Sequence, residues 1–136
     1  MTHSKPAVGM PLPLISLPKL GGGTIDIGGA RGRHMLLVVY RGKHCGRCKK
    51  YLTSLDGMAG DWEAAGFGIV TVSADPLSPQ ETDRRFAEPA VFCVRPDGII
   101  QIACLSNGPA ARPDLVELLD GMKFNIAHDR PARGMA

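Results

Sequence analysis

The sequence predicts an α/β protein with a central mixed β-sheet flanked by helices, and three observations predict it. Residues 35–40 form a continuous apolar run, and apolar residues recur at helical spacing over residues 48–62. A β-branched run follows at residues 69–73, so strand, helix and strand make a parallel unit. Residues 90–94 and 99–104 then flank a tight turn, which predicts an antiparallel hairpin.

Length and composition indicate one domain. A chain of 136 residues that is 44% hydrophobic can bury one core and is too short for two ordinary domains. We expect a flexible, proline-bearing N-terminal arm over residues 1–13, a folded domain over residues 14–128 and a loose tail over residues 129–136. The formal net charge of +3, from 16 basic and 13 acidic residues, is only mildly basic and does not imply nucleic acid.

The N-terminal half contains extended segments and one long helix. Residues 14–33 are broken by glycines, and residues 24–27 alternate apolar and polar side chains as an edge strand does. The run over residues 35–40 is typical of a strand buried on both faces. The helix that follows has apolar residues spaced by four, three, four and three positions, which form one face. That face is made of Cys48, Leu52, Leu55, Ala59 and Trp62. The sequence Gly66-Phe67-Gly68 is expected to end this helix.

The C-terminal half predicts two further helices. Ser78-Pro79-Gln80-Glu81 matches a capping box with proline at the first helical position, so a short helix should run from there to about residue 87. A last amphipathic helix is expected over about residues 113–127. Its apolar face is made of Leu115, Leu118, Leu119 and Met122.

The hairpin turn sets the expected positions of two further cysteines. The Arg-Pro-Asp-Gly sequence at residues 95–98 fits a type I turn followed by a left-handed glycine, so Arg95 should pair with Ile99. Cys93 then faces Gln101, and Cys104 falls on the opposite face of the pleat. We therefore expect both to be buried packing cysteines that cannot easily bridge each other or complete a metal site together.

The stretch RGKHCGRCKK, residues 41–50, carries two cysteines and five Lys or Arg residues without an acid. In a reducing compartment a Cys-x-x-Cys pair is more often catalytic or metal-binding than structural. The predicted helix places Cys45 at its N-terminus, where backbone N–H groups and the nearby His44 and Arg47 favour a thiolate. We predict Cys45 as the nucleophile and Cys48, one turn on and more buried, as the resolving thiol.

The phrases VVYRGKHCGRCKKYLTSL, GFGIVTVSADP and FAEPAVFCVRPDGIIQIA resemble the thioredoxin-like superfamily, in its peroxiredoxin-like (AhpC/TSA) branch. The resemblance covers residues from about 35 to 120 and implies a thioredoxin-like fold. It also implies that Pro89 is the cis-proline that starts the strand beside the redox cysteines and faces Cys45.

The resemblance departs from the peroxiredoxin pattern at the peroxide pocket. Peroxiredoxins carry Pro-x-x-x-Thr-x-x-Cys, and the equivalent positions here are Val38 and Gly42. Their active-site arginine aligns near Pro89, so Arg41 or Arg112 would have to replace it. Arg112 precedes the last helix and is also a candidate for substrate contact.

These features predict a thiol-dependent oxidoreductase that reduces peroxides or protein disulfides and is recycled by an external thiol reductant of the thioredoxin or glutathione type. No cofactor and no metal is expected. A non-enzymatic redox-sensing or binding module stays open, because the segment between Asp75 and Pro89 is shorter than in peroxiredoxin-like relatives. Zinc is disfavoured by the lack of a second Cys-x-x-Cys knuckle, and nucleic acid by an aromatic content of only 5%.

The sequence also bears on location. The first 20 residues carry four prolines and no apolar run long enough for a signal-peptide core, and no later run approaches a membrane span. We therefore expect a cytoplasmic protein that does not enter a membrane. Nothing in the sequence predicts its oligomeric state.

Overall fold

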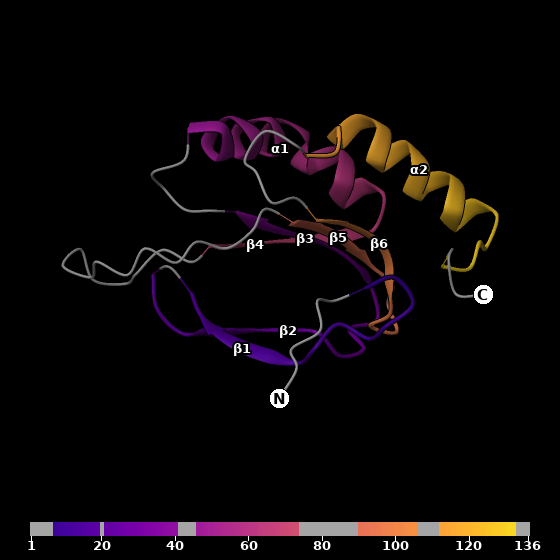
Figure 1. Cartoon of the computed structure of the whole chain (residues 1–136), viewed down its shortest axis with the longest axis horizontal. Coiled ribbons are helices and arrows are strands. Elements are labelled where there is room, and N and C mark those ends of the chain that lie inside the picture. The colour runs from indigo at the N-terminus through magenta and orange to yellow at the C-terminus, as the bar shows by residue number, and fades with distance from the viewer. Residues whose placement is uncertain (1–6, 20, 41–45, 74–89, 106–111, 133–136) are drawn as a thin grey trace.

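In the computed structural model, the described part of the chain forms six strands and two helices (Figure 1). The structure describes residues 7–19, 21–40, 46–73, 90–105 and 112–132. The strands are β1 (Ile15–Pro18), β2 (Thr24–Ile27), β3 (His34–Tyr40), β4 (Phe67–Ser73), β5 (Ala90–Val94) and β6 (Ile100–Leu105). The helices are α1 (Gly46–Ala64) and α2 (Leu115–Ala127).

Four of the strands form the central sheet, in the order β4, β3, β5, β6. Strand β3 runs parallel to β4 and antiparallel to β5, and β5 and β6 are antiparallel. Both helices cover one face of this sheet, and the small β1–β2 sheet lies across the other face (Figure 1). The predicted mixed sheet flanked by helices is confirmed, with its parallel unit and its antiparallel hairpin.

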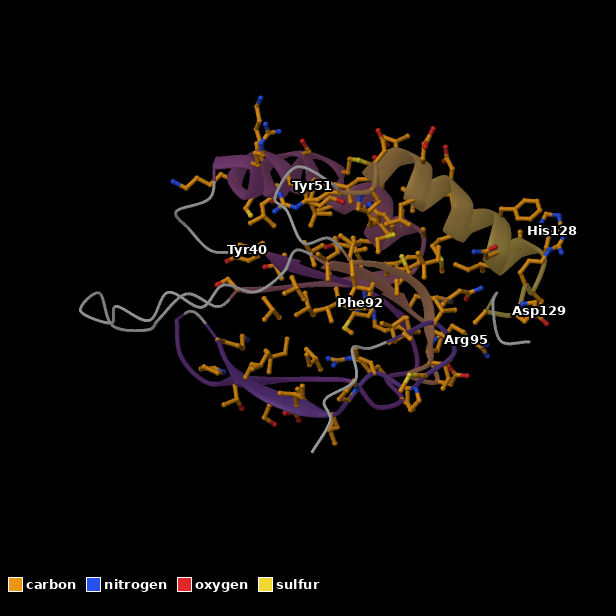
Figure 2. All side chains as sticks on the ribbon, in the orientation of Figure 1. Tyr40, Tyr51, Phe92, Arg95, His128 and Asp129 are labelled. Carbon is orange, nitrogen blue, oxygen red and sulfur yellow. The ribbon has the colours of Figure 1, made fainter. Side chains whose placement is uncertain are left out.

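Strand β3 is buried on both faces, as its apolar run predicts. Leu36 and Val38 pack under the helices, whereas Met35 and Leu37 pack toward the β1–β2 side. Phe92 of β5 joins this second cluster and points away from the helices (Figure 2). Each fully buried side chain of this kind contributes roughly 1.5–3 kcal/mol to folding. The alternation therefore fixes the register of the central strand.

The two helices pack on the sheet through the faces that their periodicity predicts. Cys48, Leu55 and Trp62 of α1 are all at most 3% exposed. Trp62 meets Phe67 edge to face, with ring centroids 4.9 Å apart, and so joins the end of α1 to the start of β4. Strand β4 begins at Phe67, two residues before the expected start at residue 69. The buried residues of α2 are Leu115, Leu118, Leu119 and Met122.

Residues 7–13, which we expected within a flexible arm, belong to the folded domain. The N–H of Gly9 donates to the carbonyl of Ile100, and the N–H of Leu12 donates to the carbonyl of Gly98, both at 2.9 Å. The Leu12 side chain is only 5% exposed. The segment therefore pairs with the start of β6. The proline content of this segment had instead pointed to a flexible arm.

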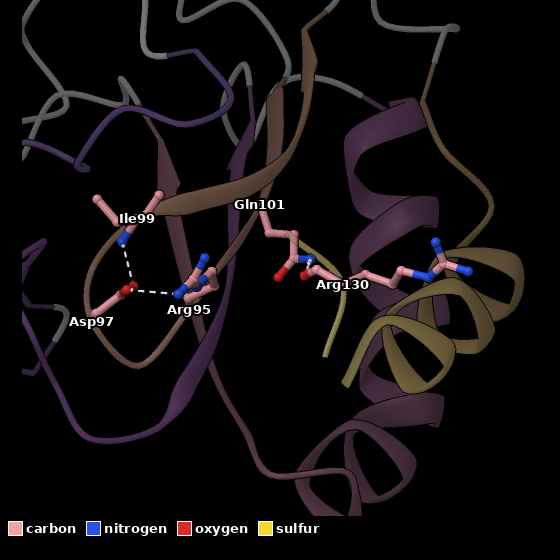
Figure 3. A network of polar contacts seen from close by, with 5 residues as sticks. All are labelled: Arg95, Asp97, Ile99, Gln101 and Arg130. Atoms are coloured by element: carbon pink, nitrogen blue, oxygen red, sulfur yellow. Dashed lines mark hydrogen bonds and ion pairs between the residues drawn. The ribbon is translucent and has the colours of Figure 1, made fainter. Parts of the chain in front are cut away.

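The described part of the expected loose tail is also packed. The side-chain amide of Gln101 in β6 donates to the carbonyl of Arg130 at 2.9 Å (Figure 3). Ala132 is 5% exposed. Gln101 is the one buried polar side chain among the described residues, and this bond satisfies it.

The β5–β6 turn is held by its own side chains, as Figure 3 shows. Asp97 accepts a hydrogen bond from the N–H of Ile99 at 3.1 Å and pairs with the Arg95 guanidinium at 2.9 Å. Gly98 has φ +89°, the left-handed conformation predicted for this glycine. A Cβ at Gly98 would lie 2.9 Å from the backbone of Gly29, so the turn also packs closely against the loop after β2.

The expectation that Cys93 and Cys104 lie on opposite faces of the sheet is wrong, whereas the expectation that they are packing cysteines is confirmed. Arg95 does pair with Ile99, but the register shifts by one residue between Cys93 and Val94. Cys93 therefore faces Ile102, and Cys104 lies two positions further along β6 on the same face of the sheet. Both cysteines pack in the cluster beneath the helices. A β-bulge of this kind leaves no clear signal in an apolar strand.

Two further expectations have a different outcome. Strand β2, expected as an edge strand, pairs antiparallel with β1 in the separate two-stranded sheet. The short helix expected over residues 78–87 lies outside the described residues. Neither described helix combines the length and the apolarity needed to cross a membrane.

Candidate active site

Cys48 lies in the first turn of α1, which begins at Gly46. The first turn of a helix has backbone N–H groups without intrahelical acceptors, and the helix dipole adds positive potential there. No acidic residue occupies this turn. Arg47 and Lys49 lie in it, and Lys50 follows it directly. The Cys48 side chain is 1% exposed, which confirms the prediction that it is buried on the face that α1 packs inward.

Arg112 makes a direct contact with this cysteine. Its Nη2 atom donates to Sγ of Cys48 at 2.7 Å. A guanidinium keeps its charge at any ordinary pH, and its hydrogen bonds to a partner that carries negative charge are stronger than neutral ones. The contact therefore stabilises negative charge as it develops on the Cys48 sulfur.

Tyr51 holds the arginine in this position. The guanidinium carbon of Arg112 lies 5.4 Å from the centre of the Tyr51 ring, within cation–π range. The Tyr51 hydroxyl donates to the carbonyl of Pro113 at 2.8 Å. Burial raises the pKa of Tyr51, so its hydroxyl stays protonated and remains a donor. One side chain of α1 thus fixes both the backbone and the side chain of the segment before α2.

A cleft of about 590 Å³ opens beside these residues, between α1 and the start of α2. Three cationic side chains of the described residues line it, those of Arg47, Lys50 and Arg112. Asp114 lines it too, but its Oδ1 atom accepts hydrogen bonds from two backbone N–H groups as the N-cap of α2. The cleft is therefore electropositive next to Cys48.

The structure brings together three of the residues singled out from the sequence, namely Arg47, Cys48 and Arg112. The others lie outside the described residues, and their roles stay predictions: these are Arg41, His44, Cys45 and Pro89. The sequence analysis missed Tyr51. A signal was present, because Tyr51 follows Cys48 by three positions and so shares the inward side of the helix.

Cys93 and Cys104 belong to the core and not to this site. Burial raises the pKa of Cys93, with a smaller contribution from the neighbouring Cys104. Burial also raises the pKa of Cys104. Both therefore stay neutral thiols at physiological pH. Within the described part of the chain, no three His, Cys, Asp or Glu side chains are grouped so that they could hold a metal ion.

The fold and the site define a class of protein. It is a thioredoxin-like α/β domain with a cysteine at the start of its first helix and an arginine that donates a hydrogen bond to the cysteine sulfur. The sequence model of the AhpC/TSA family matches residues 8–86. The chain belongs to the AhpC/TSA family. This confirms both the predicted resemblance and the predicted class of activity, a thiol-dependent oxidoreductase.

Solved structures share the fold at low sequence identity. A reduced 2-Cys peroxiredoxin from Plasmodium vivax is 15% identical, with a TM-score of 0.70 over 89% of this chain and 82% of that one. A peroxiredoxin-like protein from Aquifex aeolicus is 14% identical, with a TM-score of 0.76 over 90% of this chain and 89% of the other. AhpC from Mycobacterium tuberculosis is 14% identical, with a TM-score of 0.68 over 90% and 94%. A sequence comparison with curated proteins gave no significant match.

Proposed function

We propose that the protein is a thiol peroxidase that works with a Cys45–Cys48 dithiol. Membership of the AhpC/TSA family supports peroxide as the substrate class. The observation that carries the proposal is the 2.7 Å contact between Arg112 and the Cys48 sulfur at the start of α1. A thiol that stays neutral in the core needs no cation beside it, whereas a thiol that reacts as its thiolate is stabilised by one.

The reaction uses two electrons from the two cysteines. The Cys45 thiolate attacks one oxygen of the hydroperoxide, the O–O bond breaks, and the alkoxide or hydroxide leaves with a proton from solvent. Cys45 is then a sulfenic acid. The Cys48 thiolate attacks that sulfur, the S–O bond breaks, and a Cys45–Cys48 disulfide forms while the hydroxide leaves and takes a proton from solvent to become water. An external thiol reductant, of the thioredoxin or glutathione type, returns the two electrons.

Arg112 takes a role in this scheme that differs from the one expected from the sequence. The family's proline, threonine and arginine are absent from the usual positions, so the charge at the site must come from elsewhere. Arg112 supplies it to Cys48, and Arg47 adds to it from the same turn of α1. We place this chemistry in the cytoplasm, where the reducing poise keeps thiols available.

Disulfide exchange is the second candidate function. The Cys-Gly-Arg-Cys sequence and the burial of Cys48 favour it, because the same two thiols can reduce a disulfide through a mixed disulfide on Cys45. It differs from the peroxidase only in the oxidant. The two functions are therefore distinguished by whether a peroxide or a disulfide oxidises the reduced protein faster.

The test is the rate at which the reduced protein consumes hydrogen peroxide, with the products identified by mass spectrometry. We expect a Cys45–Cys48 disulfide in the wild type and a trapped Cys45 sulfenic acid in Cys48→Ser. A rate no higher than that of a simple thiolate would overturn the peroxidase proposal. Fast oxidation by a small disulfide under the same conditions would then establish the second candidate.

A further inference from the structure

We propose that the cleft between α1 and the start of α2 binds a small thiol that carries carboxylates and delivers it to the oxidised cysteine pair. This inference rests on the proposed function, because it names the chemistry of the reductant that recycles the Cys45–Cys48 disulfide. The two are tested separately below.

The charge of the cleft selects an anion. Among the described residues, Arg47, Lys50 and Arg112 line it, and Asp114 is the one acidic side chain that does. The Asp114 carboxylate is engaged by the N–H groups of Val116 at 2.8 Å and Glu117 at 3.1 Å. In the described part of the chain, three cations therefore face the cleft against one carboxylate that is already hydrogen bonded, and a ligand with two carboxylates matches this excess.

The size of the cleft points to the reductant rather than to hydrogen peroxide. Its volume of about 590 Å³ lies within the range of roughly 300–1,000 Å³ that small-molecule sites occupy. Hydrogen peroxide has only two non-hydrogen atoms and needs no such cleft. Tyr51, Met58 and Leu115 contribute apolar surface to its wall, against which the carbon chain of a short thiol peptide can pack.

Arg112 connects the cleft to the redox chemistry, because the same guanidinium lines the cleft and donates to the Cys48 sulfur. In the reducing step, a donor thiolate attacks the Cys45 sulfur, the Cys45–Cys48 bond breaks, and Cys48 leaves as a thiolate beside Arg112. A second donor thiolate attacks the donor sulfur of the mixed disulfide and releases the Cys45 thiolate. Two donor thiolates thus give two electrons and become one donor disulfide.

The experiment uses the full chain, oxidised by one equivalent of hydrogen peroxide. It is then reduced by glutathione, by uncharged 2-mercaptoethanol or by cationic cysteamine, compared at equal thiolate concentration. We expect glutathione to react roughly tenfold faster than cysteamine at low ionic strength, with the difference shrinking at 0.5 M salt as charges are screened. Binding of the unreactive S-methylglutathione to the reduced protein, followed by calorimetry, provides a readout without turnover.

The matched variants reverse one charge each. Lys50→Glu changes an exposed side chain in the cleft, and we expect it to cut the glutathione-to-cysteamine ratio by roughly fivefold to tenfold and to weaken S-methylglutathione binding. Lys19→Glu makes the same change at an exposed residue directly after β1, on the other side of the sheet, and should leave both unchanged.

The outcomes separate this inference from the proposed function. If peroxide forms the Cys45–Cys48 disulfide but the three thiols reduce it at rates that do not depend on their charge, the reductant inference is wrong and the peroxidase proposal is retained. An equal response to Lys50→Glu and Lys19→Glu would also overturn it. If peroxide forms no disulfide, the proposed function fails and the inference fails with it.

Discussion

Arg112 and Cys48 are 64 positions apart in the sequence, yet Nη2 of the arginine lies 2.7 Å from Sγ of the cysteine. Cys48 lies in α1, and Arg112 lies just before α2. These two helices lie side by side on one face of the sheet (Figure 1). Tyr51 of α1 donates a hydrogen bond to the backbone of Pro113 and places its ring against the Arg112 guanidinium. The site is therefore built where α1 and α2 begin.

Arg112→Gln should slow formation of the Cys45–Cys48 disulfide by roughly tenfold to a hundredfold, because a hydrogen bond to a charged group is worth about 1.5–3 kcal/mol. Arg112→Lys should recover part of the rate, since an ammonium keeps the charge without the planar geometry. Stopped-flow oxidation with quantification by mass spectrometry measures both. Arg95→Gln is the control, because Arg95 pairs with Asp97 in the exposed β5–β6 turn. A rate for Arg112→Gln equal to that of the control would rule out this role.

Tyr51 should act through Arg112. Tyr51→Phe keeps the ring but loses the hydrogen bond to Pro113, so we expect a loss of about 1 kcal/mol in the free energy of unfolding and a small effect on rate. Tyr51→Leu also removes the cation–π contact and should slow disulfide formation.

The decisive comparison for Tyr51 is a double-mutant cycle on the oxidation rate. In the Arg112→Gln background, Tyr51→Leu should have little further effect, because the group that it positions is already gone. Additive effects of the two substitutions would show that Tyr51 acts by another route.

Cys93 should make the protein less stable at alkaline pH. Burial raises the pKa of its thiol in the folded state, so above about pH 8.5 the unfolded chain loses this proton while the folded protein keeps it. The unfolded state then binds fewer protons, and the free energy of unfolding falls by up to about 1.4 kcal/mol per pH unit. Below about pH 8.5 both states hold the proton, and this loss is absent.

Urea titrations of wild type and Cys93→Ala between pH 7 and pH 10, under reducing conditions, measure the effect. The stability difference between the two proteins at pH 7 reflects packing, and it should shrink as the pH rises. Cys104→Ala is the matched comparison, since Cys104 is only half-buried and should give a smaller slope. Parallel curves for wild type and Cys93→Ala would contradict the assignment.

Gly98→Ala should destabilise the protein more than Gly21→Ala. Both glycines have φ near +88°, at +89° and +88°, so an alanine at either position carries similar backbone strain of about 1 kcal/mol. Only at Gly98 would the new Cβ meet backbone, that of Gly29 at 2.9 Å, whereas a Cβ at Gly21 meets nothing within 4 Å. Thermal unfolding of both variants gives the difference, and equal shifts in Tm would show that the loop after β2 yields without cost.

Much of the fold follows from the sequence because its elements are set by local periodicity. The apolar faces of α1 and α2, the doubly buried β3 and the Arg-Pro-Asp-Gly turn are all read correctly from spacing and turn chemistry. The packing of residues 7–13 against β6 is not, since it depends on backbone hydrogen bonds to a segment about 90 positions away.

Local patterns were enough to predict the class of this protein and to propose its redox pair, because a Cys-x-x-Cys before a helical run can be recognised without any tertiary contact. The distant side chains that contact Cys48 could not be predicted in this way, because they depend on how the two helices pack. Arg112 was one of two arginine candidates until the packing of α2 beside α1 placed it on Cys48, and Tyr51 gained a role only from that packing. The bulge that turns Cys104 to the same face as Cys93 likewise comes from the pairing of two strands, which no single strand encodes.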